Sequence, residues 1–344
     1  MSALRQERLD PLGGSRWVAL LHRSSSAGPF HHPGWLKLLR DQYRYGIEAL
    51  CVADGDGELL AGVPLAHVRS PLTGSRLVAL PFSDTCPAAV ADDAPEETTV
   101  ALAGALEDLH AETGLDVELR SDLPGLTSAA AGPAFLQHVL KLDPDFAAVE
   151  SRFAKSQIGR GIRKARREGV TVRFAADRDA LDQFFRLHVR SRRQQGVPTQ
   201  PKRFIRRFES LFREDLGWVA LACSGRQTIA AAVFLSFNGT VIYKYGASDR
   251  EQLHKRPNNL LFAEAIERAC AEGAHSLDFG RTDLDNEGLA AFKRAWGAEE
   301  RRLSYLRLGA EAGAGVPAPV QRLIWRSPPV VGRMIGAALY RHFG

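Results

Sequence analysis

The stretch from Val241 to Gly297 decides the fold, and it reads VIYKYGASDREQLHKRPNNLLFAEAIERACAEGAHSLDFGRTDLDNEGLAAFKRAWG. An aromatic strand is followed by a basic Pro-Asn loop, an amphipathic helix, a second strand ending in Asp-Phe-Gly-Arg-Thr-Asp, and a short helix. Open α/β sheets bind ligands outside the carboxyl ends of their strands. The polar residues at these strand ends therefore predict a ligand site within this stretch.

The pattern around this stretch predicts a mixed α/β fold. The second half reads strand, two helices, three strands, helix, strand, helix, strand, with an Asn238-Gly239 hairpin turn between two apolar alternating runs. The first half is a weaker version of the same order, with helices expected at 33–43 and 96–113. Its expected strands lie at 47–52, 59–68, 76–80, 117–120 and 135–142. The fold class is therefore α/β with mixed sheets, built as two similar modules.

Length and composition support this organisation. A chain of 344 residues with 45% apolar and 25% charged residues is typical of about two globular domains. We expect an N-terminal module at 1–145, a second module at 146–310 and a basic amphipathic tail at 311–344. The tail is rich in Pro and Arg, and it can either pack on the body or lie on an anionic membrane surface.

Charge is concentrated in one segment. Between Arg152 and Arg213 there are eighteen Lys and Arg residues against five acids, although the whole chain carries a net charge of only +5. Such a segment indicates either an anionic partner or a solvated basic surface that binds nothing. The four cysteines are scattered, and no secretory signal or membrane-spanning run is visible, so we expect a cytoplasmic protein.

A basic loop at 254–259 opens the amphipathic helix. Free N–H groups at a helix start, together with Lys255 and Arg256, form a ready site for an anionic ligand. Asn258 or Asn259 can cap the helix that continues through Leu260; the alternative is a capped helix without a ligand. The preceding strand is unusually polar and aromatic, and it adds three candidate substrate contacts: Tyr243, Lys244 and Tyr245.

The strand end at 278–283 carries two carboxylates, an arginine and a hydroxyl. Asp278 can act as a base or orient an amine, and Arg281 can grip a carboxylate or phosphate in a bidentate fork. Thr282 and Asp283 are candidate substrate contacts. The alternative is an internal Asp–Arg pair that holds the turn.

Two further places carry candidate residues. Lys293, between two aromatic residues, can offset negative charge on a phosphate or an oxyanion, or it can be an ordinary surface lysine. Ser83 and Asp84 follow a strand of the first module and can line a substrate groove or form a turn. The sequence contains no GxSxG, Walker A, HExxH or GxGxxG motif, which excludes the common hydrolase, P-loop, zincin and Rossmann sites, and we expect no metal site.

Taken together, these residues resemble the FemAB-like or BioF2-like (CelD-like) group of the GNAT acyltransferase superfamily. The resemblance is strong over about 145–310 and looser over 15–145. It is carried by the segments Ile162-Arg-Lys-Ala165, Arg192-Arg-Gln-Gln-Gly196, Tyr243-Lys-Tyr-Gly-Ala-Ser248, Arg256-Pro-Asn-Asn-Leu260, Asp278-Phe-Gly-Arg281 and Phe292-Lys-Arg-Ala-Trp-Gly297, with Pro33-Gly-Trp35 and Leu80-Pro-Phe-Ser-Asp84 in the first half.

The resemblance implies tandem GNAT-like modules with a cleft between them, and acyl transfer to an amine of a peptidoglycan, polysaccharide or lipid-linked envelope intermediate. It implies no tightly bound cofactor. The co-substrate is either an acyl-CoA or an aminoacyl-tRNA, with its phosphates at Lys255, Arg256, Asn258, Asn259 and Leu260. Lys293 takes the place of the lysine that assists transfer, Arg281 adds stabilisation of charge, and Asp278 orients the nucleophile.

Two alternatives from the residues themselves stay open. A non-catalytic RNA-binding protein would use the basic segment at 152–213, and we expect no DNA partner. A protein bound peripherally to the inner face of the cell membrane would use the tail.

Overall fold

The computed structural model describes residues 4–71, 74–195, 198–309, 340 and 342, so the expected tail at 311–344 lies almost wholly outside the described residues. The chain divides into two compact units, which are described one at a time. Among the described residues, unit 1 holds those up to Phe135 and from Arg302 on. Unit 2 holds the residues from Leu136 to Arg301.

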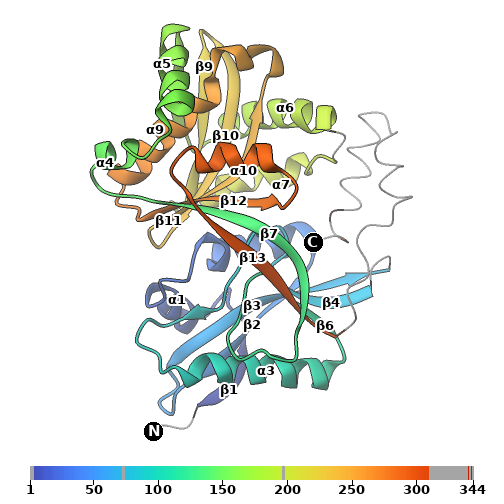
Figure 1. The fold of residues 1–344 in the computed structure, drawn as a ribbon. Coiled ribbons are helices and arrows are strands. Elements are labelled where there is room, and N and C mark those ends of the chain that lie inside the picture. Colours follow the sequence, from blue (N-terminus) through green and yellow to red (C-terminus); the bar gives the residue numbers. More distant parts are fainter. Residues whose placement is uncertain (1–3, 72–73, 196–197, 310–339, 341, 343–344) are drawn as a thin grey trace. The chain divides into compact units, whose positions relative to one another are not determined.

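Unit 1 is a mixed sheet with helices on both faces (Figure 1). Its strand order is β1-β2-β3-β4-β6-β13, with a short β5 beside β3. The strands are β1 (Arg5–Leu9), β2 (Gly46–Ala53), β3 (Leu59–Ser70), β4 (Gly74–Ala79), β5 (Ala89–Val90), β6 (Asp116–Leu119) and β13 (Glu299–Leu308), which begins in unit 2. The helices are α1 (Ser15–His22), α2 (Pro33–Tyr43) and α3 (Glu97–Thr113), with a 3-10 turn at Pro29–His31.

The core of unit 1 follows the alternation of its strands. Leu50, Val63, Leu77 and Val117 face α3, which buries Leu102 and its neighbours against them. The helix α3 ends at Gly114, whose φ of +64° is the left-handed conformation that glycine adopts without steric cost. The helix predicted at 96–113 is therefore confirmed.

The strands of unit 2 also form mixed sheet, with the order β7-β12-β11-β10-β9-β8. The strands are β7 (Ala130–Lys141, which begins in unit 1), β8 (Val170–Ala175), β9 (Gly217–Ser224), β10 (Gln227–Phe237), β11 (Thr240–Ser248) and β12 (Ser276–Asp283). The helices are α4 (Phe146–Glu150), α5 (Arg160–Arg167), α6 (Arg178–Gln195), α7 (Lys202–Arg206), α8 (Phe208–Phe212), α9 (Pro257–Ala271) and α10 (Glu287–Arg294), with a π-helical turn at Lys155–Gly159 and a 3-10 turn at Arg250–Lys255.

Helices cover both faces of this sheet, with α5 and α9 on one side and α6 on the other (Figure 1). Trp218, Phe234 and Phe262 meet in the core on the α9 side, where Trp296 is fully buried. Residues Asn238 and Gly239 join β10 to β11 with φ values of +51° and +71°, as a type I′ hairpin turn requires. The predicted α/β fold with mixed sheets is confirmed, and the element order of the second half is as expected except that α7 and α8 form where a single helix was predicted.

Candidate functional site

Strands β11 and β12 pair over only part of their length. Their parallel register joins Thr240 to Ser276, Val241 to Leu277 and Ile242 to Asp278, and it ends there. Both strands continue, β11 to Ser248 and β12 to Asp283. The two strands therefore separate after the third pair, and the backbone of β11 beyond Ile242 faces an opening instead of a neighbouring strand.

A β-bulge lies at the start of this open segment. Val233 of β10 is opposite Tyr245, and the next residue, Phe234, is opposite Tyr243, which leaves Lys244 as an extra residue in β11. The bulge turns the two tyrosines to opposite sides of the sheet. Tyr243 packs against Phe262 of α9, with ring centroids 4.9 Å apart, whereas Tyr245 lies 5.8 Å from the ring of His188 on α6.

A cavity of about 340 Å³ opens beside the separated strands. It is lined by the open part of β11, the end of α6, and the beginnings of α9 and α10. The polar lining residues are Ser191, Gln194, Tyr243, Ser248, Arg250 and Asn258. Asn258 is held in place because its side-chain oxygen accepts a hydrogen bond of 2.8 Å from the Ser248 hydroxyl. Of the residues predicted from sequence, Tyr243 and Asn258 line this cavity.

The start of α9 differs in detail from a simple anion site. Arg256 adopts a left-handed conformation with φ of +58° and is exposed, and Pro257 has no N–H to offer. The N–H of Asn259 donates to the Arg256 carbonyl at 3.1 Å. An anion here would therefore depend on the side chains of Arg250 and Arg256 more than on backbone N–H groups.

The other residues predicted to hold the donor point elsewhere. Lys255 donates a hydrogen bond of 2.9 Å from Nζ to the hydroxyl of Ser224. Asn259 is buried against α5, where even a methyl group on Gly161 would meet its side chain at 2.5 Å. Leu260 is a core residue with 1% exposure.

Asp278 is buried at the point where β11 and β12 separate. One carboxylate oxygen accepts a 2.7 Å hydrogen bond from the N–H of Gly280, and the other accepts one of 2.7 Å from the side-chain amide of Gln137 on β7. The sequence gives no signal for Gln137, because it lies 141 positions away in the chain. These two donors fix the orientation of the carboxylate.

Lys293 of α10 is also buried, with 3% of its surface exposed. Its Nζ donates to the carbonyl oxygens of Gly280 at 2.8 Å and Arg281 at 3.1 Å. Lys293 and Asp278 therefore bind the two sides of the same residue, Gly280. Gly280 itself has φ of +71°, so glycine is favoured at this turn of the backbone.

A histidine that the sequence did not single out lies in the same region. His138 of β7 contacts Glu300 through Nε2 at 3.1 Å. Burial lowers the pKa of His138, and the positive charge of Lys293 lowers it further, while Glu300 acts in the opposite direction. The lowered pKa favours the neutral form of His138.

The remaining predicted residues of β12 alternate across the strand. Thr282 is buried, with 2% exposure, whereas Arg281 and Asp283 are exposed.

Ser83 and Asp84 belong to unit 1. The Ser83 hydroxyl donates 2.7 Å to the carbonyl of Leu80, and the Ser83 carbonyl accepts from Arg120 at 2.8 Å. The Asp84 carbonyl accepts 2.7 Å from the Tyr305 hydroxyl. Both residues thus support a tight loop after β4.

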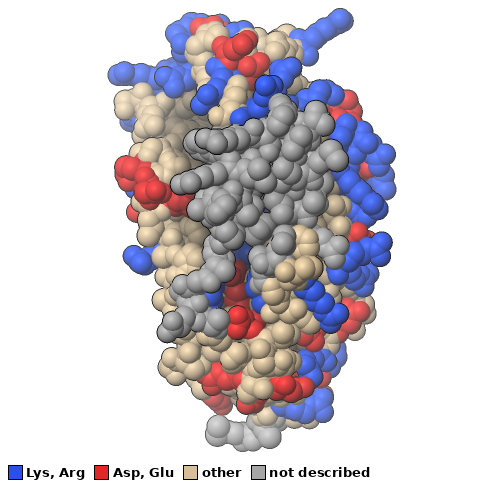
Figure 2. Space-filling model, turned by 90° about the vertical axis from the view of Figure 1, so that its right-hand side faces the viewer, with Lys and Arg blue, Asp and Glu red and all other residues tan. Residues whose placement is uncertain are grey.

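A basic surface is formed where the start of α6 meets α7 and α8. It surrounds a hollow of about 430 Å³, whose charged lining residues are Arg178, Lys202, Arg203, Arg206, Arg207, Arg213 and Glu209. Asp182 and Glu209 pair with Arg206 and Arg178, so cations remain in excess. Basic side chains are also plentiful along the upper and right-hand edges of the face shown in Figure 2.

Comparison with known proteins gives one match in sequence. Residues 152–294 match the acetyltransferase (GNAT) domain, which covers most of unit 2 and less than half of the chain. No curated protein is a significant match to the sequence. The chain therefore contains a GNAT-type acetyltransferase domain.

Several solved structures share the fold along nearly the whole chain. FemX is 15% identical with a TM-score of 0.68, and the match covers 94% of this chain and 100% of FemX. A tandem GNAT protein from the clavulanic acid biosynthesis pathway is 15% identical with a TM-score of 0.53, over 91% of this chain and 100% of its own. The C-terminal domain of a putative lysylphosphatidylglycerol synthetase from Agrobacterium fabrum is 12% identical with a TM-score of 0.57, over 91% and 95%.

These structural similarities confirm the predicted fold of this chain, a mixed α/β fold that matches tandem GNAT-like structures. Within the described residues, no helix is long and apolar enough to cross a membrane.

Proposed function

We propose that the protein is an acyltransferase that moves an acyl or aminoacyl group from an activated donor to an amine of a cell-envelope intermediate. The observation that carries this proposal is the separation of β11 from β12 beside the 340 Å³ cavity at the start of α9. An extended donor with amide groups can add to the open edge of β11 as a further strand would. The match of residues 152–294 to an acetyltransferase domain supports the same reaction class.

The donor is an acyl-CoA or an aminoacyl-tRNA, and the residues present fit either one in outline. The acyl chain of the donor would enter the cavity of about 340 Å³, and Arg250, which lines this cavity, would bind the phosphates of the donor. Arg256 adds an exposed guanidinium at the start of α9. Lys255 can reach the same phosphates only if its hydrogen bond to the Ser224 hydroxyl breaks.

In the reaction, the amine nitrogen attacks the acyl carbonyl carbon, the new C–N bond forms, and the C–S or C–O bond to the donor breaks. The amine loses one proton and the leaving group gains one. We assign Lys293 and Arg281 to stabilisation of the negative charge that develops, and Asp278 to orientation of the amine. Because Asp278 and Lys293 both bind Gly280, the end of β12 is held rigid during this step.

An acceptor from the cell envelope is favoured by the sequence resemblance to the FemAB-like group. The structural likeness to FemX and to a putative lysylphosphatidylglycerol synthetase is in keeping with it. In this scheme Asp283, which is exposed at the end of β12, is an acceptor contact of unit 2.

The test is an intact-mass screen of purified protein with acetyl-CoA, longer acyl-CoAs and aminoacyl-tRNA against amine acceptors. With an active pair in hand, Lys293→Met should lower kcat by about a hundredfold or more, which is typical of losing one group that stabilises an oxyanion. Lys155→Met replaces an exposed lysine of the same unit and should leave kcat unchanged. Full turnover by Lys293→Met would refute the role assigned to Lys293, and the absence of every donor reaction would refute the proposal as a whole.

A second candidate function is binding of a polyanion such as RNA at the basic surface of α6–α8. The excess of cations around its hollow favours this candidate. Binding would weaken steeply with salt, and Arg203→Glu with Arg207→Glu would abolish it while Lys293→Met would not. Binding that ignores both salt and these reversals would exclude this candidate.

A further inference from the structure

The helix α5 of unit 2 is basic on every side that does not face the core. Its eight residues, Arg160–Arg167, include five Lys and Arg residues and no acid, and the first acid after them is Glu168. Four of the five cations are exposed, and Lys164 is half-buried. We call these residues the α5 cations: Arg160, Arg163, Lys164, Arg166 and Arg167.

The inner side of α5 is packed against α9, which lies beside it on one face of the sheet (Figure 1). Ile162 and Ala165 are buried in the core of unit 2. A methyl group on Gly161 would meet the side chain of Asn259 on α9 at 2.5 Å, so the two helices approach closely. Because this inner side is fixed in the fold, α5 presents its cations from a rigid support.

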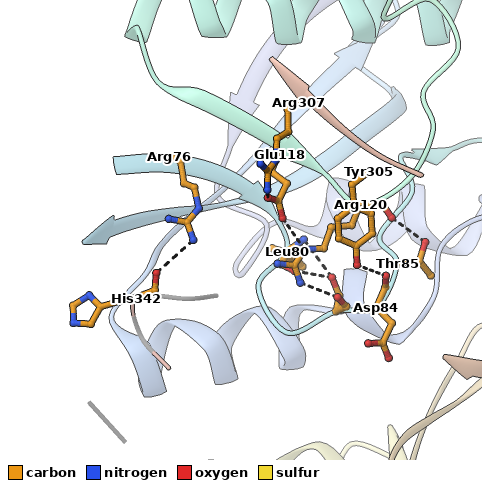
Figure 3. Close-up of polar contacts among 10 residues, drawn as sticks. Arg76, Leu80, Asp84, Thr85, Glu118, Arg120, Tyr305, Arg307 and His342 are labelled. Atoms are coloured by element: carbon orange, nitrogen blue, oxygen red, sulfur yellow. Dashed lines mark hydrogen bonds and ion pairs between the residues drawn. The ribbon is translucent and has the colours of Figure 1, made fainter. Parts of the chain in front are cut away.

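The α5 cations have no acidic partners, unlike arginines elsewhere in the chain. None of their side chains forms a hydrogen bond or an ion pair with the residues that the structure describes. By contrast, Arg268 on the neighbouring α9 pairs with Glu272 at 2.7 Å. In unit 1, Arg307 pairs with Glu118 at 2.9 Å (Figure 3). The charges of α5 are therefore available to a partner outside the chain.

The acids close to α5 leave an excess of positive charge. Glu168 follows the helix and is exposed. Burial raises the pKa of Glu264 on α9; Arg166 lowers this pKa and Glu267 raises it, and the net shift is upward. Even when Glu168, Glu264 and Glu267 are all ionised, three carboxylates face five cations.

The positions of the cations also weaken the isolated helix. The first turn of a helix carries a partial positive charge and is stabilised by acids, but α5 begins with Arg160 and has no acid in its first turn. Arg163 and Arg167 follow Arg160 at intervals of three and four residues. The three therefore lie on one side of the helix, where like charges repel. A negatively charged surface would relieve this repulsion.

Composition and shape favour a flat anionic surface over a nucleic acid. Proteins bind single-stranded nucleic acid in basic grooves that contain aromatic side chains for base stacking. Residues 160–169 contain no aromatic residue, and the α5 cations lie on the convex outside of a helix. Clusters of about four to eight Lys and Arg residues on an amphipathic helix are typical of binding to anionic lipid headgroups.

We propose that the α5 cations bind unit 2 to the surface of an anionic lipid bilayer. Each Lys or Arg close to such a surface raises the affinity by about fivefold, and the attraction decreases as salt increases. The large apolar residue of α5, Ile162, is buried, so this helix binds headgroups and inserts no side chain into the hydrocarbon. That the bilayer presents a lipid-linked acceptor rests on the proposed function; the binding itself does not.

The experiment measures sedimentation of the full-length protein with lipid vesicles at low salt, without donor or acceptor. Wild-type protein should bind vesicles of phosphatidylcholine and phosphatidylglycerol, and it should not bind vesicles of phosphatidylcholine alone. The combination of Arg160→Gln, Arg163→Gln and Arg167→Gln should weaken binding by about a hundredfold, because three charges are lost. Lys at the same three positions keeps the charges and should preserve binding.

A matched control lies on α6, which covers the other face of the sheet. Arg186→Gln, Arg190→Gln and Arg193→Gln together remove three exposed arginines at similar spacing and should leave vesicle binding close to that of wild type. Thermal unfolding separates lost binding from lost folding. The α5 triple Gln variant should unfold at the wild-type temperature or above, because repulsion between like charges is removed.

Three results would overturn the proposal. They are no binding of wild-type protein to the anionic vesicles, unchanged binding by the α5 triple Gln variant, and an equal loss in the α5 and α6 triple variants. Binding of a single-stranded RNA oligonucleotide that requires the α5 arginines, without vesicle binding, would assign these cations to a nucleic acid instead. Because the assay contains neither donor nor acceptor, its failure leaves the proposed acyl transfer standing.

Discussion

The two units contain the same motif, a pair of parallel strands joined through a helix, but only one pair stays closed. In unit 1, β4 and β6 pair from Arg76–Asp116 to Ala79–Leu119, and both strands end there. In unit 2, β11 and β12 pair only as far as Ile242–Asp278, and both strands continue past that point. A shared architecture thus yields an open backbone edge in one unit and a closed sheet in the other.

The side chains differ in the same way. Around the open edge of unit 2, Asp278 accepts hydrogen bonds from two neutral donors, and Lys293 donates hydrogen bonds to two carbonyl oxygens. On the closed sheet of unit 1, Glu118 accepts hydrogen bonds from the guanidinium groups of Arg307 and Arg120. The comparison teaches that the open edge of unit 2 leaves backbone groups of β11 without a neighbouring strand, whereas the closed sheet of unit 1 pairs its charged side chains with one another.

The largest expected effect comes from removing one core tryptophan at a time. Trp296 in unit 2 and Trp17 in unit 1 are both fully buried. Trp296→Ala and Trp17→Ala should each lower the free energy of unfolding by about 3–5 kcal/mol. Hydrogen exchange followed by mass spectrometry should show faster exchange in β10–β12 for the first variant and in β2–β3 for the second. A uniform rise in the exchange rate across both units in both variants would contradict the expectation that each tryptophan stabilises its own unit.

An intermediate effect is expected from pH. His188 is buried, stacks 5.1 Å from Phe184, and burial lowers its pKa to about 3. The unfolded chain takes up this proton near pH 6.5, so stability is fully present above that pH and is lost as the pH falls toward 3. His188→Phe should remove this loss, a gain of about 2 kcal/mol at pH 5 relative to pH 7.5.

The matched histidine in unit 1 is His32. Its Nδ1 accepts the Gly34 N–H at the start of α2, and burial lowers its pKa to about 4. His32→Asn keeps a capping oxygen and should also reduce acid sensitivity, but through unit 1. Urea unfolding of both variants from pH 7.5 to 4.5 checks this. If His188→Phe follows the wild-type pH profile, the assignment to unit 2 is wrong.

The smallest effect concerns the helices that join each parallel pair. Both α3 and α9 are followed by a left-handed glycine, Gly114 with φ of +64° and Gly273 with φ of +76°, and space is open around each. Gly114→Ala and Gly273→Ala should therefore each cost about 1 kcal/mol from backbone conformation alone. Chemical denaturation measures both. A cost of several kcal/mol at one site would reveal a difference in packing that the geometry does not show.

The sequence predicts the elements better than it predicts the sites. Helices α3 and α9 and the Asn238-Gly239 turn carry strong local signals, and all three form as expected. Strand β1 and helix α1 are short, and no local sequence pattern predicts them. Local periodicity is enough for elements, because it is set by neighbours a few residues apart.

The sites depend on contacts between distant parts of the chain. Gln137 reaches Asp278 across 141 positions, and Arg307 reaches Glu118 across 189. Sequence periodicity shows that each strand alternates, but the register between strands decides which polar side chains meet. This is why Tyr243 and Asn258, which line the cavity, could be singled out from the sequence, while the contacts of Gln137 and Arg307 could not.

The bulge at Lys244 has a consequence for how this protein can be altered. The extra residue determines which side of the sheet each tyrosine faces. Because this depends on the number of residues in β11, exchanging one residue for another does not change it. Deletion of Lys244 would shift the alternation of side chains by one residue, so Tyr245, Ala247 and their neighbours would turn to the opposite faces of the sheet. Libraries of point substitutions would leave this property intact, whereas a scan of single-residue deletions would expose it.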